Sequence, residues 1–296
     1  MTPSPQHLAL LAAERAVREE ILIDGVKTAY WRYPAEGSAK PEGTIAMVHG
    51  YRGNHLGLAA IVGALPSFDV IVPDLPGFGD SDPIERHDIG HYRDWLTGFV
   101  SEVAGGKSII VAHSFGTIVA SAAAANGMRN DLVLLNPISV AKRRGLAAFR
   151  QSGVDFFNWL ACTLPSFAGN ALTRNWLAVQ AMSSTLAKTH DSELRAWIHR
   201  QHHENFSDFK TLRVATEGYV ASTTESVLGY APEVANRVLL VAGELDEISP
   251  LENQRQALGV FGSAQLEVIP GVGHLIHYEK PAEAAALISG FAAECR

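Results

Sequence analysis

The sequence lacks the features of secreted, metal-binding and membrane-spanning proteins. Its 296 residues contain two cysteines, Cys162 and Cys295, whose separation fits no metal or redox motif and indicates a reducing compartment. The first 20 residues carry no basic leader before their short apolar run, which is interpreted as part of a surface helix. No uninterrupted apolar stretch approaches the roughly 20 residues that a membrane span needs. We therefore expect a cytoplasmic protein without a membrane span.

An excess of positive charge is also missing. The formal net charge is -7 at pH 7, which gives no broad attraction to polyanions, so we expect no nucleic-acid partner. The local basic cluster Lys142-Arg143-Arg144 is interpreted as a solvated loop face. Hydrophobic residues make up 47% of the chain and charged residues 19%, which is typical of a globular protein with a sizeable core.

The first half of the chain alternates between buried strands and helices. Nearly continuous apolar runs predict strands, helical patterns separate them, and an Asp24-Gly25 turn predicts an antiparallel hairpin at a sheet edge within residues 20–33. This alternation favours a parallel sheet with helices on both faces. The strands are expected at 44–48, 68–73, 109–113 and 131–135, and the helices at 55–65, 91–103 and 115–126.

The strand pattern stops near residue 138 and resumes at 238–242. The interval is helical and aromatic, and either an inserted lid or a second domain would explain it. Because strands resume, we predict a core domain of residues 1–137 and 232–296 with a helical lid over 138–231. Lid aromatics such as Phe156, Phe157 and Trp159 are expected mostly to pack the lid onto the core, with a few lining an apolar acyl pocket. After it, a helix is expected at 251–259, a strand at 264–269 and a helix at 281–294.

A serine stands at the junction of a predicted strand and a predicted helix, in Ala112-His113-Ser114-Phe115-Gly116. A strained turn at such a junction exposes a serine hydroxyl above the sheet edge, and crowding requires small residues two positions before and after it. Gly116 meets this requirement, while Ala112 stands where glycine is usual. Ser114 is therefore a candidate nucleophile.

Two further candidates follow later strands. Asp246 lies in Gly243-Glu244-Leu245-Asp246, and His274 follows Gly273 after the last predicted strand. The carboxyl ends of parallel strands meet at one edge of a sheet, so the three side chains are expected together. Serine needs an imidazole to take its proton, and a carboxylate must orient that imidazole. We predict Ser114, Asp246 and His274 as catalytic residues, with Glu244 and Glu247 as rivals to Asp246.

Acyl transfer also needs hydrogen-bond donors for the developing oxyanion. The backbone N–H groups of Phe115, directly after the serine, and Tyr51, in the turn after the 44–48 strand, are the predicted donors. Arg52 is either a holder of a substrate carboxylate or a surface or salt-bridged arginine. Candidate substrate-binding residues are His49, Gly50, Arg52 and His113.

Several histidines receive plainer interpretations. His199, His202 and His203, with Glu204, have spacings that can bind metal on one helix face. An exposed polar face of a lid helix explains them without a metal, so we predict no metal site. His277 is expected to be structural or exposed.

Taken together, these motifs resemble the α/β-hydrolase fold superfamily, in its lid-bearing serine esterase and C–C hydrolase branch. The resemblance covers roughly residues 20–137 and 232–296, and the lid carries no motif of its own. It implies an eight-stranded, mostly parallel sheet, a serine nucleophile, no cofactor, and hydrolysis through an acyl-enzyme. It also implies a supporting role for Asp74. The motifs that carry it are His49-Gly50-Tyr51, Asp74-Leu75-Pro76-Gly77-Phe78-Gly79-Asp80-Ser81, and the segments around Ser114, Asp246 and His274.

Serine at position 114, in place of aspartate, argues against dehalogenase or epoxide hydrolase chemistry. The leading hypothesis is a hydrolase of a small carboxylic ester with an apolar acyl or alcohol part. One alternative is a C–C bond hydrolase of a vinylogous diketone acid, whose carboxylate Arg52 or a lid arginine would hold. The other is a non-catalytic ligand-binding protein on the same scaffold. The sequence leaves open whether the protein is a monomer or a homodimer.

Overall fold

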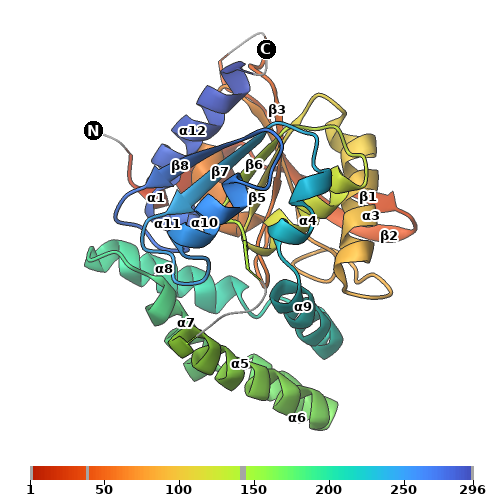
Figure 1. Cartoon of the computed structure of the whole chain (residues 1–296), viewed down its shortest axis with the longest axis vertical. Coiled ribbons are helices and arrows are strands. Elements are labelled where there is room, and N and C mark those ends of the chain that lie inside the picture. The colour runs from red at the N-terminus through yellow and green to blue at the C-terminus, as the bar shows by residue number, and fades with distance from the viewer. Residues whose placement is uncertain (1–2, 38–39, 141–144, 295–296) are drawn as a thin grey trace.

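The computed structural model describes residues 3–37, 40–140 and 145–294. The basic cluster Lys142-Arg143-Arg144 and Cys295 lie outside these ranges. Figure 1 shows the sheet with helices α12 and α3 on opposite sides of it.

Eight strands form one sheet in the order β1-β2-β4-β3-β5-β6-β7-β8. Strand β2 pairs antiparallel with both β1 and β4, whereas all the other pairs are parallel. The predicted eight-stranded, mostly parallel sheet is therefore confirmed. The strands are β1 (Val17–Ile23), β2 (Val26–Tyr33), β3 (Thr44–Val48), β4 (Asp69–Pro73), β5 (Ile109–His113), β6 (Leu132–Leu135), β7 (Val238–Gly243) and β8 (Ala264–Ile269).

The hairpin of β1 and β2 turns at Asp24 and Gly25, which have φ values of 50° and 81°. Positive φ at both central residues is the signature of the tight turn that suits twisted strands. The sequence analysis began the hairpin at residue 20, which is too late. Helix α1 (Pro5–Glu14) ends before that point, and Val17 already pairs with Arg32.

Successive side chains of each strand point to opposite faces of the sheet, which divides the core into two layers. In β3, Ile45 and Met47 belong to one cluster, and Ala46 and Val48 belong to the other. The first cluster packs α1, α2 (Ala59–Gly63) and α12 (Pro281–Glu294) against the sheet, and the second packs α3 (Ile89–Phe99), α4 (Phe115–Ala125) and α10 (Leu251–Leu258). Both faces of the sheet are thus covered, as predicted.

Short helical turns extend several of these elements. The helix expected at 55–65 begins at the expected residue as a 3-10 turn, η1 (His55–Leu58), and continues as α2; the Asn54 side chain caps its start by accepting from Leu56 N–H. The others are η2 (Val100–Ala104), η3 (Val227–Gly229), η4 (Ala231–Glu233) and α11 (Ile276–Glu279).

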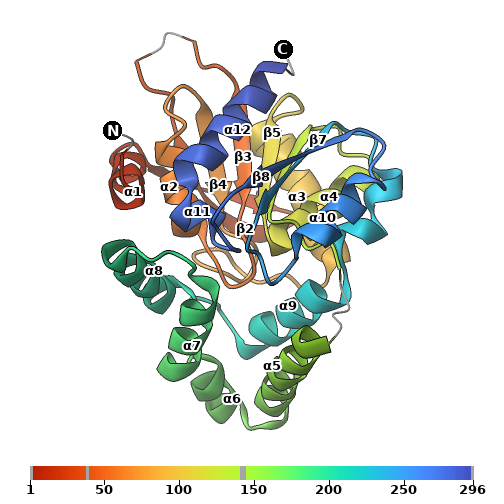
Figure 2. The same cartoon turned by 60° about the vertical axis from the view of Figure 1, so that its left-hand side comes forward.

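In the described ranges, five α-helices lie between β6 and β7 and gather on one side of the core (Figures 1 and 2). They are α5 (Gly145–Thr163), α6 (Ser166–Thr173), α7 (Trp176–Leu186), α8 (Ser192–Asn205) and α9 (Leu212–Thr224). The loop between α8 and α9 contacts the turn that follows β4, where Gly79 N–H donates to Asp208 O at 3.0 Å and Lys210 N–H donates to Gly77 O at 2.8 Å. The helices therefore lie at the carboxyl ends of the strands.

The aromatic residues of α5 differ from the prediction. Phe156 and Trp159 are 60% and 58% exposed and contact each other, with ring centroids 5.6 Å apart, instead of packing onto the core. Contact with the core is made by α9, whose Val214 and Ala215 are buried in the core's apolar cluster, and by α8, whose Leu194 and Ile198 pack with Leu275 and Tyr278. The sequence alone did not distinguish α5 from α9, because both carry aromatic side chains.

None of the helices in the described ranges combines the length and the apolar character required to cross a membrane.

Candidate active site

Ser114 occupies a strained turn between β5 and α4, with φ 52° and ψ -118°. Its N–H donates to Leu135 O of the neighbouring strand at 3.1 Å. A Cβ atom at Gly116 would lie 2.7 Å from the carbonyl oxygens of both Val48 and His49, so only glycine fits there. The close packing of α4 on β3 therefore fixes the turn that carries the serine.

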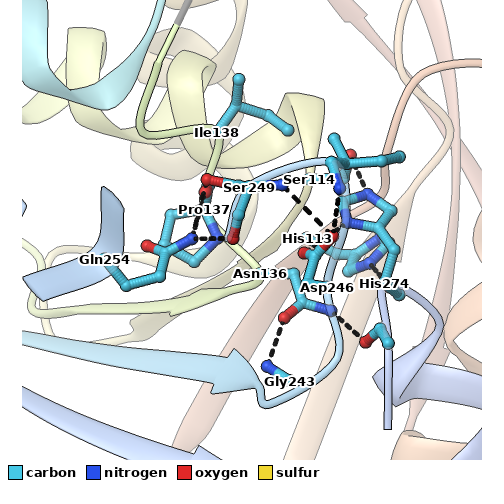
Figure 3. Close-up of polar contacts among 12 residues, drawn as sticks. His113, Ser114, Asn136, Pro137, Ile138, Gly243, Asp246, Ser249, Gln254 and His274 are labelled. Atoms are coloured by element: carbon cyan, nitrogen blue, oxygen red, sulfur yellow. Dashed lines mark hydrogen bonds and ion pairs between the residues drawn. The ribbon is translucent and has the colours of Figure 1, made fainter. Parts of the chain in front are cut away.

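Three side chains from three strand ends meet at this turn (Figure 3). His274 Nε2 lies 2.8 Å from Ser114 Oγ, and His274 Nδ1 lies 2.8 Å from Asp246 Oδ2. The side chains of His274 and Asp246 are 7% and 1% exposed. The other carboxylate oxygen, Oδ1, accepts from the N–H groups of Ile248 and Ser249 at 2.7 and 3.2 Å.

The hydrogen-bond partners of His274 indicate which of its ring nitrogens carries the proton. Asp246 is an acceptor, so His274 Nδ1–H donates to it, and His274 Nε2 accepts from the Ser114 hydroxyl. The arrangement can move the serine proton onto the imidazole and stabilise the resulting positive charge with the carboxylate.

The rival carboxylates are engaged elsewhere. Glu244 Oε2 accepts from Gly271 N–H at 2.9 Å, and Glu247 Oε1 lies 2.9 Å from Lys188 Nζ. Both contacts are exposed, whereas Asp246 is buried.

The sequence interpretation missed Asn136, which directly follows β6 and is fully buried. Its Oδ1 accepts from Gly243 N–H at 2.7 Å, and its Nδ2 donates to Gly273 O at 3.0 Å. One amide thus joins the strand end before Asp246 to the residue before His274 (Figure 3). The sequence did contain a signal for this role: Asn136 is a polar residue directly after β6, the strand next to β5.

A buried polar network supports the loop that carries the acid (Figure 3). Ser249 Oγ accepts from Ser139 N–H at 3.1 Å and from Gln254 Nε2 at 2.9 Å. Gln254 Nε2 also lies 2.8 Å from Pro137 O, and its Oε1 accepts from the Ser139 hydroxyl at 2.7 Å. The network ties the segment after β6 to the segment after β7.

His113 and His49 bind protein groups. His113 Nε2–H donates to His274 O at 3.1 Å, and burial, followed by the proximity of His274, lowers the pKa of His113 to about 3. His49 Nε2 accepts from Leu75 N–H at 2.8 Å, and its Nδ1–H donates to Gly50 O at 2.8 Å. Burial lowers the pKa of His49 as well. Both imidazoles are neutral supports of neighbouring loops.

His277 is buried and lies behind His113, with ring centroids 4.1 Å apart. Burial and the neighbouring histidines hold the pKa of His277 well below its usual value. His277 therefore has a structural role.

The two predicted oxyanion donors lie beside the serine. Phe115 N–H is the first amide of α4 and has no acceptor within that helix. Within the described ranges, Tyr51 N–H has no backbone acceptor. Gly50 is so near the serine that an added Cβ would lie 3.2 Å from Ser114 Cβ. In the described part of the chain neither amide thus has a backbone acceptor, and Gly50, which precedes Tyr51, packs against Ser114.

The side chains of Tyr51 and Arg52 contact the inserted helices. Tyr51 Oη–H donates to Ala215 O of α9 at 2.6 Å, and burial raises the pKa of this phenol to about 12. Arg52 donates to two backbone carbonyls, Phe206 O and Thr173 O, each at 2.8 Å.

Asp74 supports the turn after β4, and its side chain is fully buried. Its Oδ1 accepts from the backbone N–H of His55 at 2.8 Å and contacts His55 Nδ1 at 3.0 Å, and its Oδ2 accepts from Asp80 N–H at 2.9 Å. A Cβ at Gly79 would lie 2.0 Å from Asp74 Oδ2, so this turn requires glycine.

The histidines of α8 do not form an exposed face, so that prediction was wrong. His199 Nδ1 and His202 Nδ1 lie 2.6 and 2.7 Å from Ser183 Oγ of α7, and His202 is buried. His203 Nε2 lies 2.7 Å from Gln180 Oε1, also on α7. These side chains join two helices, and in the part of the chain that the structure describes no group of three or more His, Cys, Asp or Glu residues could hold a metal ion.

Comparison with known proteins identifies the family. The model of the Alpha/beta hydrolase family matches residues 45–287. This chain therefore belongs to the α/β-hydrolase family, and it is a hydrolase.

Its relatives are distant. The uncharacterized hydrolase YugF of Bacillus subtilis is 22% identical over 270 residues, which cover 88% of this chain and 92% of YugF. The biotin biosynthesis bifunctional protein BioHC of Teredinibacter turnerae is 23% identical over 245 residues, which cover 75% of this chain and 39% of BioHC. The chain thus matches less than half the length of BioHC.

Among solved structures, the esterase EaEST from Exiguobacterium antarcticum superimposes with a TM-score of 0.74. The match covers 94% of this chain and 100% of the esterase at 15% sequence identity. At this identity the similarity shows the fold alone.

Proposed function

We propose that this protein is a serine hydrolase that cleaves a carboxylic ester with an apolar acyl or alcohol part through an acyl-enzyme. Ser114 is the nucleophile, His274 the general base and acid, and Asp246 the acid that orients the imidazole. The backbone N–H groups of Tyr51 and Phe115 form the oxyanion hole. The observation that carries the proposal is the continuous hydrogen-bonded chain from Ser114 Oγ through His274 to Asp246, with 2.8 Å at each step.

In the acylation half, Ser114 Oγ attacks the ester carbonyl carbon while His274 Nε2 takes the hydroxyl proton. The carbonyl oxygen becomes an oxyanion and accepts hydrogen bonds from the amides of Tyr51 and Phe115. His274 then gives its proton to the leaving alcohol as the carbon–oxygen bond breaks. In the second half, water takes the place of the serine hydroxyl, and its attack releases the carboxylic acid and restores Ser114.

We also propose that residues 138–231 act as a lid over a core of residues 1–137 and 232–296. Residues 153–187 contain only two charged residues, Asp155 and Arg174. Asp155 accepts from the Tyr219 hydroxyl, and Arg174 donates to two carbonyls of the same insertion, so both charges are engaged within it. The low charge of this stretch of the insertion suits an apolar substrate group.

Hydrolysis of a C–C bond in a vinylogous diketone acid is the less favoured alternative. That hypothesis needed Arg52 or a lid arginine to hold the substrate carboxylate. Arg52 instead donates to Phe206 O and Thr173 O, and Arg174 donates to Ser207 O and Phe209 O. Backbone carbonyls thus engage these two arginines, and on this ground we favour the ester.

The test is a series of p-nitrophenyl esters, from acetate to long chain, run beside a dienoate ring-cleavage substrate. We expect turnover of the esters, greatest for an apolar acyl group, and its loss by several orders of magnitude in Ser114→Ala. Dienoate turnover without ester turnover would favour the C–C hydrolase, and no turnover of either would favour a binding protein.

A further inference from the structure

The turn after β3 is fastened to the helical insertion by the residue that follows Tyr51. Arg52 Nε–H donates to Phe206 O, directly after α8, and Arg52 Nη2–H donates to Thr173 O, the last residue of α6. Both donor–acceptor distances are 2.8 Å. A single guanidinium thus joins the core turn to two separate segments of the insertion.

The surroundings of this guanidinium fix its position. Its central carbon lies 4.3 Å from the ring centroid of Phe206 and 5.2 Å from that of Phe209. Burial lowers the pKa of Arg52. Within the described ranges, no carboxylate forms an ion pair with it. A partly buried cation held by carbonyls and aromatic faces has few alternative positions.

The backbone at Arg52 needs such support. Gly53 N–H donates to Gly50 O at 3.1 Å, which closes a four-residue turn with Tyr51 and Arg52 at its centre. Arg52 has φ 59° at the third position, where turns with positive φ favour glycine or asparagine. A long side chain in this conformation persists only when surrounding contacts hold it.

We infer that Arg52 is a positioning residue for the oxyanion hole. Through its bonds to Phe206 O and Thr173 O it holds the Gly50–Gly53 turn, and with it the Tyr51 N–H, against Ser114. The inference rests on the proposed serine hydrolase function and goes beyond it, because it makes the donor geometry depend on docking of the insertion.

Arg174 offers a matched control. It directly follows α6 and donates to Ser207 O at 2.8 Å and Phe209 O at 2.6 Å, with its central carbon 4.2 Å from the Phe209 ring centroid. It therefore binds the same loop as Arg52 and stacks on the same ring, but Arg174 itself belongs to the insertion, whereas Arg52 belongs to the core turn. Loss of Arg174 weakens the insertion without releasing the core turn.

The experiment compares Arg52→Met, Arg52→Lys and Arg174→Met in the full chain. The readouts are kcat and KM for the best p-nitrophenyl ester, the inhibition constant of a trifluoromethyl ketone with the same acyl chain, and the melting temperature. Ser114 Oγ adds to the ketone carbon and its proton passes to His274, so the resulting hemiketal oxyanion reports on the donors directly.

Removal of one oxyanion donor costs about 10²–10³-fold in kcat, and a displaced donor costs less, so Arg52→Met is expected to lower kcat about 10- to 100-fold. The ketone should bind more weakly by a similar factor, while KM changes by less than about threefold. Arg52→Lys should recover part of the loss, because it keeps a donor but cannot reach both carbonyls. Arg174→Met should retain kcat within about threefold.

Retention of kcat within threefold in Arg52→Met would overturn the inference, and so would an equal loss in Arg174→Met. If Arg52→Met does not fold, Arg52→Lys decides: kcat and ketone binding must fall together with KM unchanged, and any other pattern contradicts the inference. Failure of the proposed function can be told apart from failure of this inference before any variant is made. In that case the wild-type protein would neither hydrolyse the esters nor bind the ketone at Ser114.

Discussion

Replacement of Asp246 by asparagine tests the acid at atomic detail, because the structure dictates how the new amide must orient. Asp246 Oδ1 accepts from two backbone N–H groups, those of Ile248 and Ser249. An asparagine must keep its carbonyl oxygen on these donors, so its NH2 group faces His274 Nδ1. The imidazole must then accept at Nδ1 and carry its proton on Nε2, where it can no longer take the Ser114 proton.

The expected loss follows from this wrong tautomer. An enzyme with this constellation and an intact geometry loses about 10⁴-fold in kcat when its acid becomes an amide, which corresponds to about 5 kcal/mol of transition-state stabilisation. We expect a similar loss for Asp246→Asn, with KM changed little. The assay is steady-state hydrolysis of the best ester, together with the rate of labelling by a fluorophosphonate, which needs the same proton transfer.

Glu247→Gln is the matched control. It lies next to Asp246 in the chain, but its side chain is 58% exposed and pairs with Lys188 at the surface. We expect kcat within about threefold of the wild type, since exposed ion pairs contribute little. A loss below tenfold in Asp246→Asn, or a larger loss in Glu247→Gln, would refute the assignment of the acid.

Further predictions test the surroundings of the site. Asn136→Leu leaves the buried Gly243 N–H and Gly273 O without partners and should lower the free energy of unfolding by about 2–6 kcal/mol in urea titrations; an unchanged midpoint would contradict this. Gly116→Ala places a Cβ atom 2.7 Å from two carbonyl oxygens and should cost about 1–3 kcal/mol by the same measurement. Between pH 6 and pH 5 the free energy of unfolding should fall, because burial holds the pKa of His87 and His202 near 4 and that of His113 near 3, while the unfolded histidines take up protons. Each contributes up to about 1.4 kcal/mol per pH unit in this window, and a flat urea midpoint would exclude the effect.

The regular elements of the core were predictable because their signals are local. The strand at 264–269 and the helix at 281–294 were predicted with the bounds that the structure gives them. Asp24-Gly25 specified the hairpin turn through its need for positive φ. The first strand was harder to place, since most of its side chains are exposed or half-buried and its polar residues gave no apolar run. Its start is set by pairing with β2.

Contacts between distant segments could not be predicted from local patterns. Asn136 reaches residues 107 and 137 positions away, at Gly243 and Gly273, and Arg52 reaches Phe206 across 154 positions. The histidines of α8 were read as an exposed face because their partner, Ser183, comes from another helix. Burial of such polar groups depends on tertiary packing, which helical periodicity does not encode.

The most direct test of the account is to find which atom a fluorophosphonate modifies. The labelled protein is digested, and the modified peptide is identified by mass spectrometry in the wild type and in Ser114→Ala. The account predicts a single adduct on Ser114 that disappears in Ser114→Ala, with the melting temperature of the variant unchanged. An adduct on another residue, or ester hydrolysis that survives in Ser114→Ala at the wild-type rate, would contradict it.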